Sequence, residues 1–335
     1  MEKIKVGVIG AGRIGKLHTE NLVRSLPQVK VVAVADVFAD NIKEWATELG
    51  VEKVYADYHD ILNDKEIDAV IICSPTNTHL RITIEAANAG KHVFCEKPID
   101  YDLDKIDQAL KAVEKAGVKF QVGFNRRFDH NFKAVQNMVQ DGKIGNVNIV
   151  KITSRDPNPP SIDYVKVSGG LFLDMMIHDF DMARYLSGSE VDEVYASGAV
   201  LVDKAIGDAG DIDTAIVSLK FKNGALGVID NSRKAAYGYD QRVEVFGSKG
   251  CVTVKNDTDN STELSTEESV TTLKPKYFFL ERYKDSFIDE MVCFFNSIIS
   301  DAPVKVGAID GLNAVKIALA AKKSLETGKP VKIEY

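Results

Sequence analysis

The sequence predicts an α/β protein of two domains, a doubly wound parallel sheet followed by an α+β domain on a largely antiparallel open sheet. Up to about residue 120, apolar runs alternate with helix-periodic segments, as in a parallel sheet covered on both faces. Beyond that point, strand-like runs follow one another through tight turns, which is typical of antiparallel sheets. The 335 residues suffice for two separate cores, and we expect domains at residues 1–123 and 124–335.

The expected strands of the first domain are apolar along their whole length, which indicates burial on both faces. They lie at residues 5–9, 29–36, 69–73, 92–95 and 119–123. Helical periodicity separates them, at residues 18–24, 41–49, 79–89 and 103–116. This order predicts the doubly wound architecture, in which helices cover both faces of the sheet.

The second domain has a different pattern of expected secondary structure, with consecutive strand-like runs between residues 191 and 255. A helix at 132–141, a strand at 146–154 and a single helix at 172–186 precede them, and two late helices at 281–299 and 309–327 close the chain. Residues 256–271 are rich in Asp, Thr, Ser and Glu. This polar stretch fits an exposed hairpin or a loop, and we expect a loop.

Charge and cysteine pattern exclude several classes of protein. The net charge of -7 argues against a nucleic acid or an anionic membrane surface as partner. No apolar run approaches the roughly 18–20 residues that span a bilayer, and the N-terminal sequence lacks a signal peptide's apolar stretch. The four cysteines are scattered without metal-ligand spacing, so we expect reduced thiols, no metal and a cytoplasmic location.

A glycine pattern follows the first expected strand and opens the first expected helix, GAGRIG at residues 10–15. In a dinucleotide-binding βαβ unit, Gly10 permits the tight turn, Gly12 lets a pyrophosphate approach the backbone, and Gly15 lets the helix pack on the strand. Such glycines also occur in ordinary turns of other α/β folds, but the second check is met, because Asp36 ends the next strand. The sequence therefore predicts a Rossmann-type nucleotide site.

The acid at residue 36 favours NAD over NADP, because a carboxylate accepts hydrogen bonds from the ribose hydroxyls and repels a 2′-phosphate. Arg13 could still reach a phosphate, so NADP stays open. Further polar residues follow the strand at 69–73, at the edge where doubly wound sheets bind ligands. Ser74, Thr76 and Asn77 could donate to the cofactor or cap the next helix, and His79 fits a structural role better.

Two segments offer groups for proton transfer. In CEKP at 95–98, the charged pair Glu96–Lys97 ends a buried strand at the same ligand-bearing edge of the sheet. Asp174 and His178 are four residues apart, so on one helix they would share a face and the carboxylate could orient the imidazole. Apolar neighbours indicate that this helix is largely buried, where an ionisable pair suggests function, although a structural histidine remains an alternative.

These motifs resemble those of the Gfo/Idh/MocA family of sugar and polyol oxidoreductases, and particularly its inositol 2-dehydrogenase branch. The resemblance is spread over more than half the chain and keeps the family's order. It rests on GAGRIG (10–15), Asp36, SPTNTH (74–79), CEKP (95–98), GFNRRFD (123–129), SRDPNPP (154–160) and GGLFLDMMIHDFDMARYL (169–186). It implies an N-terminal Rossmann domain and a C-terminal domain whose open sheet mediates contacts in a homo-oligomer, a tetramer or a dimer.

The resemblance also implies the site residues. His178 would take the proton of the substrate hydroxyl, Lys97 would hydrogen-bond the reacting oxygen, and Asp174 would orient His178. The implied substrate-binding set is Lys97, Arg126, Arg127, Asp156, Asp174, His178 and Tyr237. The expected cofactor-binding set is Gly10, Gly12, Arg13, Ile14, Asp36, Ser74, Thr76, Asn77, His79, Glu96 and Lys97.

The activity that the resemblance implies is NAD-dependent oxidation of a cyclic polyol, first of all myo-inositol. Some inositol dehydrogenases carry His-Arg-Asn-Pro where this chain has SRDP at 154–157, which leaves scyllo-inositol, another isomer or an aldopyranose as alternatives. A non-enzymatic NAD-binding sensor is a further alternative. The joint presence of Lys97, Asp174 and His178 disfavours it, because a sensor has no need of proton-transfer residues.

Overall fold

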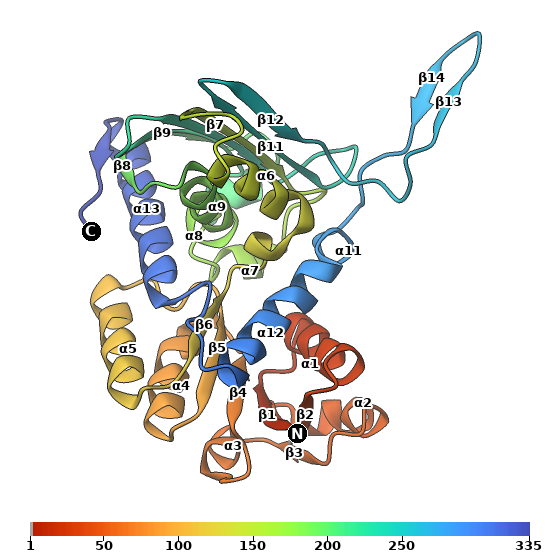
Figure 1. Ribbon diagram of the computed structural model, residues 1–335, viewed down its shortest axis with the longest axis vertical. Helices are drawn as coiled ribbons and strands as arrows, with labels where there is room; N and C mark the ends of the chain where they lie inside the picture. The colour runs from red at the N-terminus through yellow and green to blue at the C-terminus, as the bar shows by residue number, and fades with distance from the viewer. Residues whose placement is uncertain (1–2) are drawn as a thin grey trace. The chain divides into compact units, whose positions relative to one another are not determined.

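The chain folds into two compact units in the computed structural model, which describes residues 3–335 (Figure 1). Unit 1 runs up to Asn125 and also includes Asp285–Leu312. Unit 2 consists of Arg126–Lys284 and Asn313–Tyr335. The segment after residue 284 therefore returns to the first unit, whereas the sequence predicts two continuous domains.

Unit 1 contains a six-stranded sheet in the order β3-β2-β1-β4-β5-β6, and every pairing in it is parallel. Its strands are β1 (Ile4–Ile9), β2 (Val29–Ala35), β3 (Lys53–Tyr55), β4 (Ala69–Ile72), β5 (His92–Glu96) and β6 (Phe120–Gly123). This confirms the doubly wound parallel sheet. The short edge strand β3 was not expected, since three residues give too little periodicity to detect.

Helices cover both faces of this sheet, with α4 and α5 on one side and α1 and α12 on the other (Figure 1). Those of unit 1 are α1 (Arg13–Ser25), α2 (Lys43–Glu48) after a 3₁₀ turn η1 (Ala39–Ile42), α3 (His59–Asn63), α4 (Thr76–Asn88), α5 (Leu103–Ala116) and most of α12 (Lys284–Ile299). The limits of α5 follow from its sequence. The Asp102 side chain caps its first N–H groups, and Gly117, at φ +66°, ends it.

Unit 2 is built on a seven-stranded sheet in the order β12-β11-β7-β10-β9-β8-β15. Its strands are β7 (Val147–Arg155), β8 (Val191–Ala199), β9 (Thr214–Phe221), β10 (Leu226–Ser232), β11 (Asp240–Gly247), β12 (Gly250–Val254) and β15 (Val331–Lys332). All pairings are antiparallel except β7 with β10, which confirms the largely antiparallel sheet. Buried and exposed residues alternate along β9, so one face packs on helices and the other is open.

The helices of unit 2 cover one face of that sheet. They are α6 (His130–Gln140), α7 (Ile162–Val165), α8 (Leu171–Asp174), α9 (Ile177–Ser187), α10 (Lys204–Asp208), α11 (Phe279–Arg282) and the greater part of α13 (Ala308–Thr327). The expectation of one helix over 172–186 is wrong. The helix is interrupted at Met175–Met176, so Asp174 ends α8 while His178 lies in the first turn of α9.

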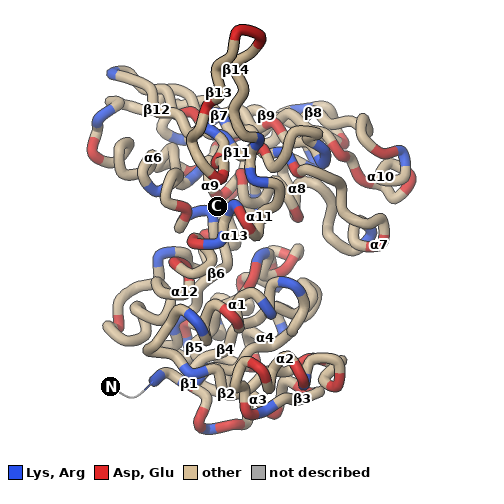
Figure 2. The backbone as a smooth tube through the Cα atoms, turned by 90° about the vertical axis from the view of Figure 1, so that its right-hand side faces the viewer, with Lys and Arg blue, Asp and Glu red and all other residues tan. Residues whose placement is uncertain are grey.

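The polar segment 256–271 contains the start of a hairpin. The prediction of a loop is therefore wrong, and the alternative, an exposed hairpin, is confirmed. Strands β13 (Glu263–Ser265) and β14 (Val270–Thr272) pair only with each other, and every residue in them is exposed. Figures 1 and 2 show the hairpin standing away from the rest of unit 2, with acidic residues at its tip. Within residues 3–335, no helix combines the length and apolarity needed to cross a membrane.

Candidate active site

The glycine loop of unit 1 lies between the end of β1 and the start of α1. Gly10 has φ +92°, and a Cβ there would lie 2.6 Å from the amide nitrogen of Ser74, so only glycine fits. A Cβ on Gly15 would lie 1.9 Å from the carbonyl oxygen of Gly10, which explains the close packing of helix on strand. A Cβ on Gly12, by contrast, would meet no described atom within 4 Å. The loop therefore has open space where a pyrophosphate would approach the N-terminus of α1.

Asp36 follows β2 and is hydrogen-bonded to the glycine loop. One carboxylate oxygen, Oδ2, accepts a hydrogen bond from the amide of Ala11 at 2.7 Å, and Oδ1 accepts one from the amide of Phe38 at 2.9 Å. Each oxygen keeps acceptor capacity for a ribose hydroxyl. The carboxylate is thus fixed beside the glycine loop, as the spacing predicts for a dinucleotide site.

The loop after β4 leads into α4, whose N-cap is Pro75. The Ser74 hydroxyl bonds that of Thr78, while Asn77 is exposed at the start of the helix. His79 is 2% exposed, with one ring nitrogen 2.8 Å from the carbonyl oxygen of Pro98 and the other 2.7 Å from that of Ser74. His79 therefore has a structural task, since it ties this loop to the segment that follows Lys97.

Glu96 ends β5 and belongs to a buried cluster. Nε2 of His18, on α1, lies 2.8 Å from Oε1 of Glu96 and 3.9 Å from Oε1 of Glu290, on α12. Among the described residues, this is the one group of His, Cys, Asp and Glu whose donor atoms lie close enough to hold a metal ion. Burial raises the pKa of Glu290 well above its usual range, which favours the neutral acid, a poor metal ligand. We interpret the cluster as a structural support of the strand end that carries Lys97.

In unit 2, Asp174 is fixed by two other elements. The Tyr164 hydroxyl, from α7, donates to its Oδ1 at 2.8 Å, and Nη2 of Arg233 lies 3.0 Å from its Oδ2. His178 is half-buried and follows the break between α8 and α9. Because the two helices are separate, the side-chain relation of Asp174 and His178 depends on the turn at Met175–Met176 rather than on regular helix spacing.

Asp156 directly follows β7 and lies beside the same arginine. Its Oδ2 is 3.6 Å from Nη1 of Arg233, and its side chain is 25% exposed. The pKa of Asp156 is raised to about 6. Burial is the main cause and the neighbouring charge of Asp174 adds to it, whereas the charge of Arg233 acts in the opposite direction. Unit 2 therefore brings together two expected site residues, Asp156 and Asp174, through Arg233, which sequence reasoning missed.

Arg126 and Arg127 each bind an aspartate of α9. Arg126 is 5% exposed, and its Nη1 donates a hydrogen bond to Asp179. Burial of Asp179 raises the pKa of its carboxyl group. Arg127 forms a bidentate pair with Asp181, at 2.8 and 2.6 Å. Tyr239 is a second residue that sequence reasoning missed, since its hydroxyl accepts from Nη2 of Arg126 at 3.4 Å. Its signal was the second tyrosine of the same YGYD stretch that suggested Tyr237.

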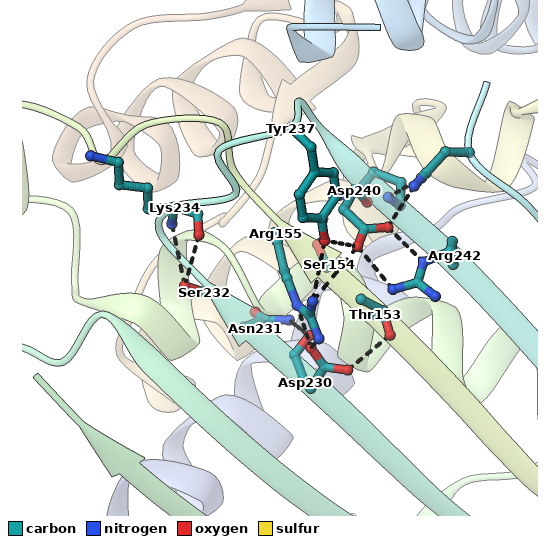
Figure 3. Close-up of polar contacts among 12 residues, drawn as sticks. Thr153, Ser154, Arg155, Asp230, Asn231, Ser232, Lys234, Tyr237, Asp240 and Arg242 are labelled. Atoms are coloured by element: carbon teal, nitrogen blue, oxygen red, sulfur yellow. Dashed lines mark hydrogen bonds and ion pairs between the residues drawn. The ribbon is translucent and has the colours of Figure 1, made fainter. Parts of the chain in front are cut away.

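Tyr237 lies in a different polar cluster (Figure 3). Its hydroxyl donates to Asp240 and accepts from Nη1 of Arg155, which also pairs with Asp230. Arg155 and the fully buried Ser154 are neighbours on β7, so their side chains point to opposite faces of the sheet. The hydrogen bonds given for the Tyr237 hydroxyl are thus with Asp240 and Arg155 rather than with Asp156, Arg233 or Asp174.

Comparison with known protein families gives two matches. Residues 4–124 match the model described as "Oxidoreductase family, NAD-binding Rossmann fold", GFO_IDH_MocA. Residues 132–253 match the GFO/IDH/MocA C-terminal domain. The two matches agree with the two types of sheet in the structure.

Individual relatives match over almost the whole chain. An uncharacterized oxidoreductase, YrbE, of Bacillus subtilis is 54% identical over 334 residues, covering 100% of this chain and 98% of that protein. The myo-inositol 2-dehydrogenase of Thermotoga maritima is 51% identical, with 99% of each chain covered. The crystal structure of scyllo-inositol dehydrogenase from Lactobacillus casei, with bound NAD(H) and scyllo-inositol, superposes with a TM-score of 0.92 at 34% identity, covering 99% of each chain.

Proposed function

The chain belongs to the Gfo/Idh/MocA family of NAD-binding oxidoreductases, and from this premise we propose that it oxidises a secondary hydroxyl of a cyclic polyol. The preferred substrate is myo-inositol, and the product is 2-keto-myo-inositol (scyllo-inosose). The observation that carries this proposal is the pair of oriented carboxylates, Asp156 and Asp174, on either side of Arg233. A polyol presents many hydroxyl donors, and fixed, partly buried acceptors recognise them selectively.

The residues of unit 1 fit NAD. The open space at Gly12, the N-terminus of α1 and the fixed carboxylate of Asp36 match the pyrophosphate and the ribose of a dinucleotide. Bound NAD supplies the acceptor for the hydride that leaves the substrate carbon. The remaining cofactor contacts that we propose come from Arg13, Ile14, Ser74, Thr76, Asn77, Glu96 and Lys97.

The proton is handled by side chains of this chain. His178 accepts the proton of the substrate hydroxyl, and Lys97 donates a hydrogen bond to the same oxygen. Asp174 orients His178. Asp156 binds a second hydroxyl, and Arg126, Arg127 and Tyr237 complete the proposed substrate set. Carbon loses a hydride and oxygen loses a proton, so the alcohol becomes a ketone and NAD becomes NADH.

Scyllo-inositol is a second candidate, because one residue of the proposed substrate set differs from that of some inositol dehydrogenases. Asp156 stands where some inositol dehydrogenases carry Asn, and exchanging an amide for a carboxylate removes a donor from the site. The ligand-bound relative from Lactobacillus casei also carries scyllo-inositol. Another isomer or an aldopyranose are further candidates within the family, and a non-catalytic sensor is disfavoured by the presence of Lys97, Asp174 and His178.

The setting that we propose is cytoplasmic inositol catabolism by a homo-oligomer, a tetramer or a dimer. Support for the oligomer comes from the open face of the unit 2 sheet, which exposes four large hydrophobic side chains, Tyr195, Ile216, Leu226 and Phe246. Light scattering coupled to size exclusion measures this state directly. A monomer at micromolar concentration contradicts the oligomer.

The substrate is tested by following NADH formation at 340 nm with purified protein and a polyol panel. The panel holds myo-inositol, scyllo-inositol, other inositol isomers and aldopyranoses. We expect the highest kcat/KM with myo-inositol. Rapid turnover of glucose or another pyranose with no turnover of any inositol would reject the proposal.

The assigned chemistry is tested by Lys97→Ala and His178→Ala. Loss of a positioned proton-transfer group costs about 10²–10⁴-fold in rate, so each variant should lose turnover while NAD still binds. Binding is measured by fluorescence titration with NADH. A near-normal rate in either variant contradicts the role given to that residue.

A further inference from the structure

The one parallel pair of the unit 2 sheet brings two charged residues together. Strands β7 and β10 run side by side, with Arg155 opposite Ser232 at their carboxyl ends. Asp156 directly follows β7, and Arg233 directly follows β10. Both residues therefore emerge at the same edge of the sheet. Backbone hydrogen bonds join the two segments there, from Asp156 N–H to Ser232 and from Ala235 N–H to Asp156.

Arg233 is almost fully buried, with 3% of its surface exposed. Its guanidinium lies between two carboxylates, 3.0 Å from Asp174 and 3.6 Å from Asp156. Its Nε is buried and makes no hydrogen bond to any described residue. A buried arginine is costly unless it is paired, so these carboxylates stabilise its charge and it stabilises theirs.

Arg233 is itself held in place. Its backbone N–H donates to the carbonyl of Asp213 at 2.8 Å, which fixes the point where the chain leaves β10. On the other side of the cluster, the Tyr164 hydroxyl fixes the second oxygen of Asp174. The orientation of Asp174 therefore depends on two groups from outside its own helix, one from α7 and one from the end of β10.

We propose that Arg233 is a positioning residue of the dehydrogenase site, which holds Asp174 and Asp156 as two ionised, oriented acceptors for two hydroxyl groups of one polyol. It would act through these carboxylates rather than on the reacting atoms. This inference rests on the proposed function, because it assigns the substrate hydroxyls to the same cluster.

The charges around the cluster determine what loss of Arg233 does. Asp156 faces Arg233, Asp174, Arg126 and Asp179, and Arg233 also faces Asp211. Without the guanidinium, the remaining acids outnumber the bases. The pKa of Asp156, already raised by burial, therefore rises further, and this carboxylate protonates at a higher pH.

The test compares Arg233→Met, which removes the charge, with Arg233→Lys, which keeps it. An opposite charge at this range shifts a carboxyl pKa by about 1–3 units. We therefore expect Arg233→Met to move the acidic limb of the kcat/KM profile upward by about one unit or more, with Arg233→Lys in between. Arg24→Met, at a side chain that is 69% exposed, is the matched control and should leave the profile unchanged.

A second readout does not depend on any substrate. The melting temperatures of wild type and Arg233→Met are compared from pH 8 down to pH 5. Protonation relieves the unpaired carboxylates, so we expect the deficit of the variant to shrink as the pH falls. A deficit that is constant with pH, or an unshifted kcat/KM profile, overturns the proposal. If wild type oxidises no polyol, the proposed function fails, whereas the melting series still decides the role of Arg233.

Discussion

Asp36 has two tasks in this structure, and one substitution can separate them. One oxygen holds the glycine loop through the amide of Ala11, the other accepts from the amide of Phe38 just after β2, and the charge opposes a 2′-phosphate. Asp36→Asn keeps an oxygen acceptor for Ala11 but removes the charge. A hydrogen bond to a charged group contributes about 1.5–3 kcal/mol, so the preference for NAD over NADP should fall about 10–100-fold.

The measurement is kcat/KM for both cofactors at one saturating polyol concentration. Asp40→Asn is the control, because Asp40 is a nearby exposed carboxylate that pairs only with Lys43 among its described contacts. An unchanged cofactor ratio in Asp36→Asn would show that the carboxylate serves the loop alone.

Some site residues could be predicted from sequence because their role depends on the backbone or on local spacing. Gly10 and Gly15 are required by contacts that any such turn makes, and Asp36 follows from the length of one βαβ unit. Arg233 has no such local signal. Its partners, Asp156 and Asp174, come from segments about 60–77 residues earlier. The parallel register of β7 with β10 places Asp156 beside Arg233, and Asp174 reaches it from the end of α8.

At the scale of elements, α12 carries a buried acid into the core of unit 1. Neither carboxyl oxygen of Glu290 has a hydrogen-bond partner among the described residues, and burial raises its pKa well above the usual range. A folded-state pKa above the unfolded one means that the folded protein binds this proton more tightly. This proton therefore contributes to the free energy of unfolding at acid pH, and the contribution is lost as the pH rises above the usual range of glutamate pKa values.

Glu290→Gln removes this dependence, because the amide has nearly the shape of the neutral acid. We expect variant and wild type to melt together near pH 5, and the variant to become the more stable one toward pH 9. The gap should be about 2–4 °C for each kcal/mol. Asp289→Asn, at an exposed position on the same helix, should show no such trend. Parallel melting curves across this range would contradict a neutral Glu290.

Helices and strands with a clear hydrophobic periodicity were predicted well. Elements whose bounds depend on tertiary contacts were not. Helix α5 lies at the expected residues because its cap, its apolar stripe and its terminal glycine agree. The break between α8 and α9 carries no proline or glycine, since Met175 and Met176 are ordinary helix formers. The hairpin of β13 and β14 has only three residues in each strand, too few for alternation to distinguish it from a loop.

At the scale of the whole molecule, the path of the chain differs from the predicted division at residue 123. Unit 1 recruits Asp285–Leu312 from beyond unit 2. Helix α12 supplies Met291, Phe294 and Phe295, each fully buried in the same core as the strands of the Rossmann sheet. The sequence shows that α12 is amphipathic, but an apolar stripe alone does not say which core it covers.

This division predicts how fragments behave. Truncating one buried Phe or Met costs about 2–5 kcal/mol, so losing three such side chains approaches the 5–15 kcal/mol of an average domain. Residues 1–125 alone should therefore lack a cooperative thermal transition and bind NADH poorly. The same segment joined to residues 285–312 by a flexible linker should melt cooperatively, as followed by circular dichroism, and bind NADH. If residues 1–125 fold and bind NADH as well as the joined fragment does, α12 is dispensable to the nucleotide-binding core.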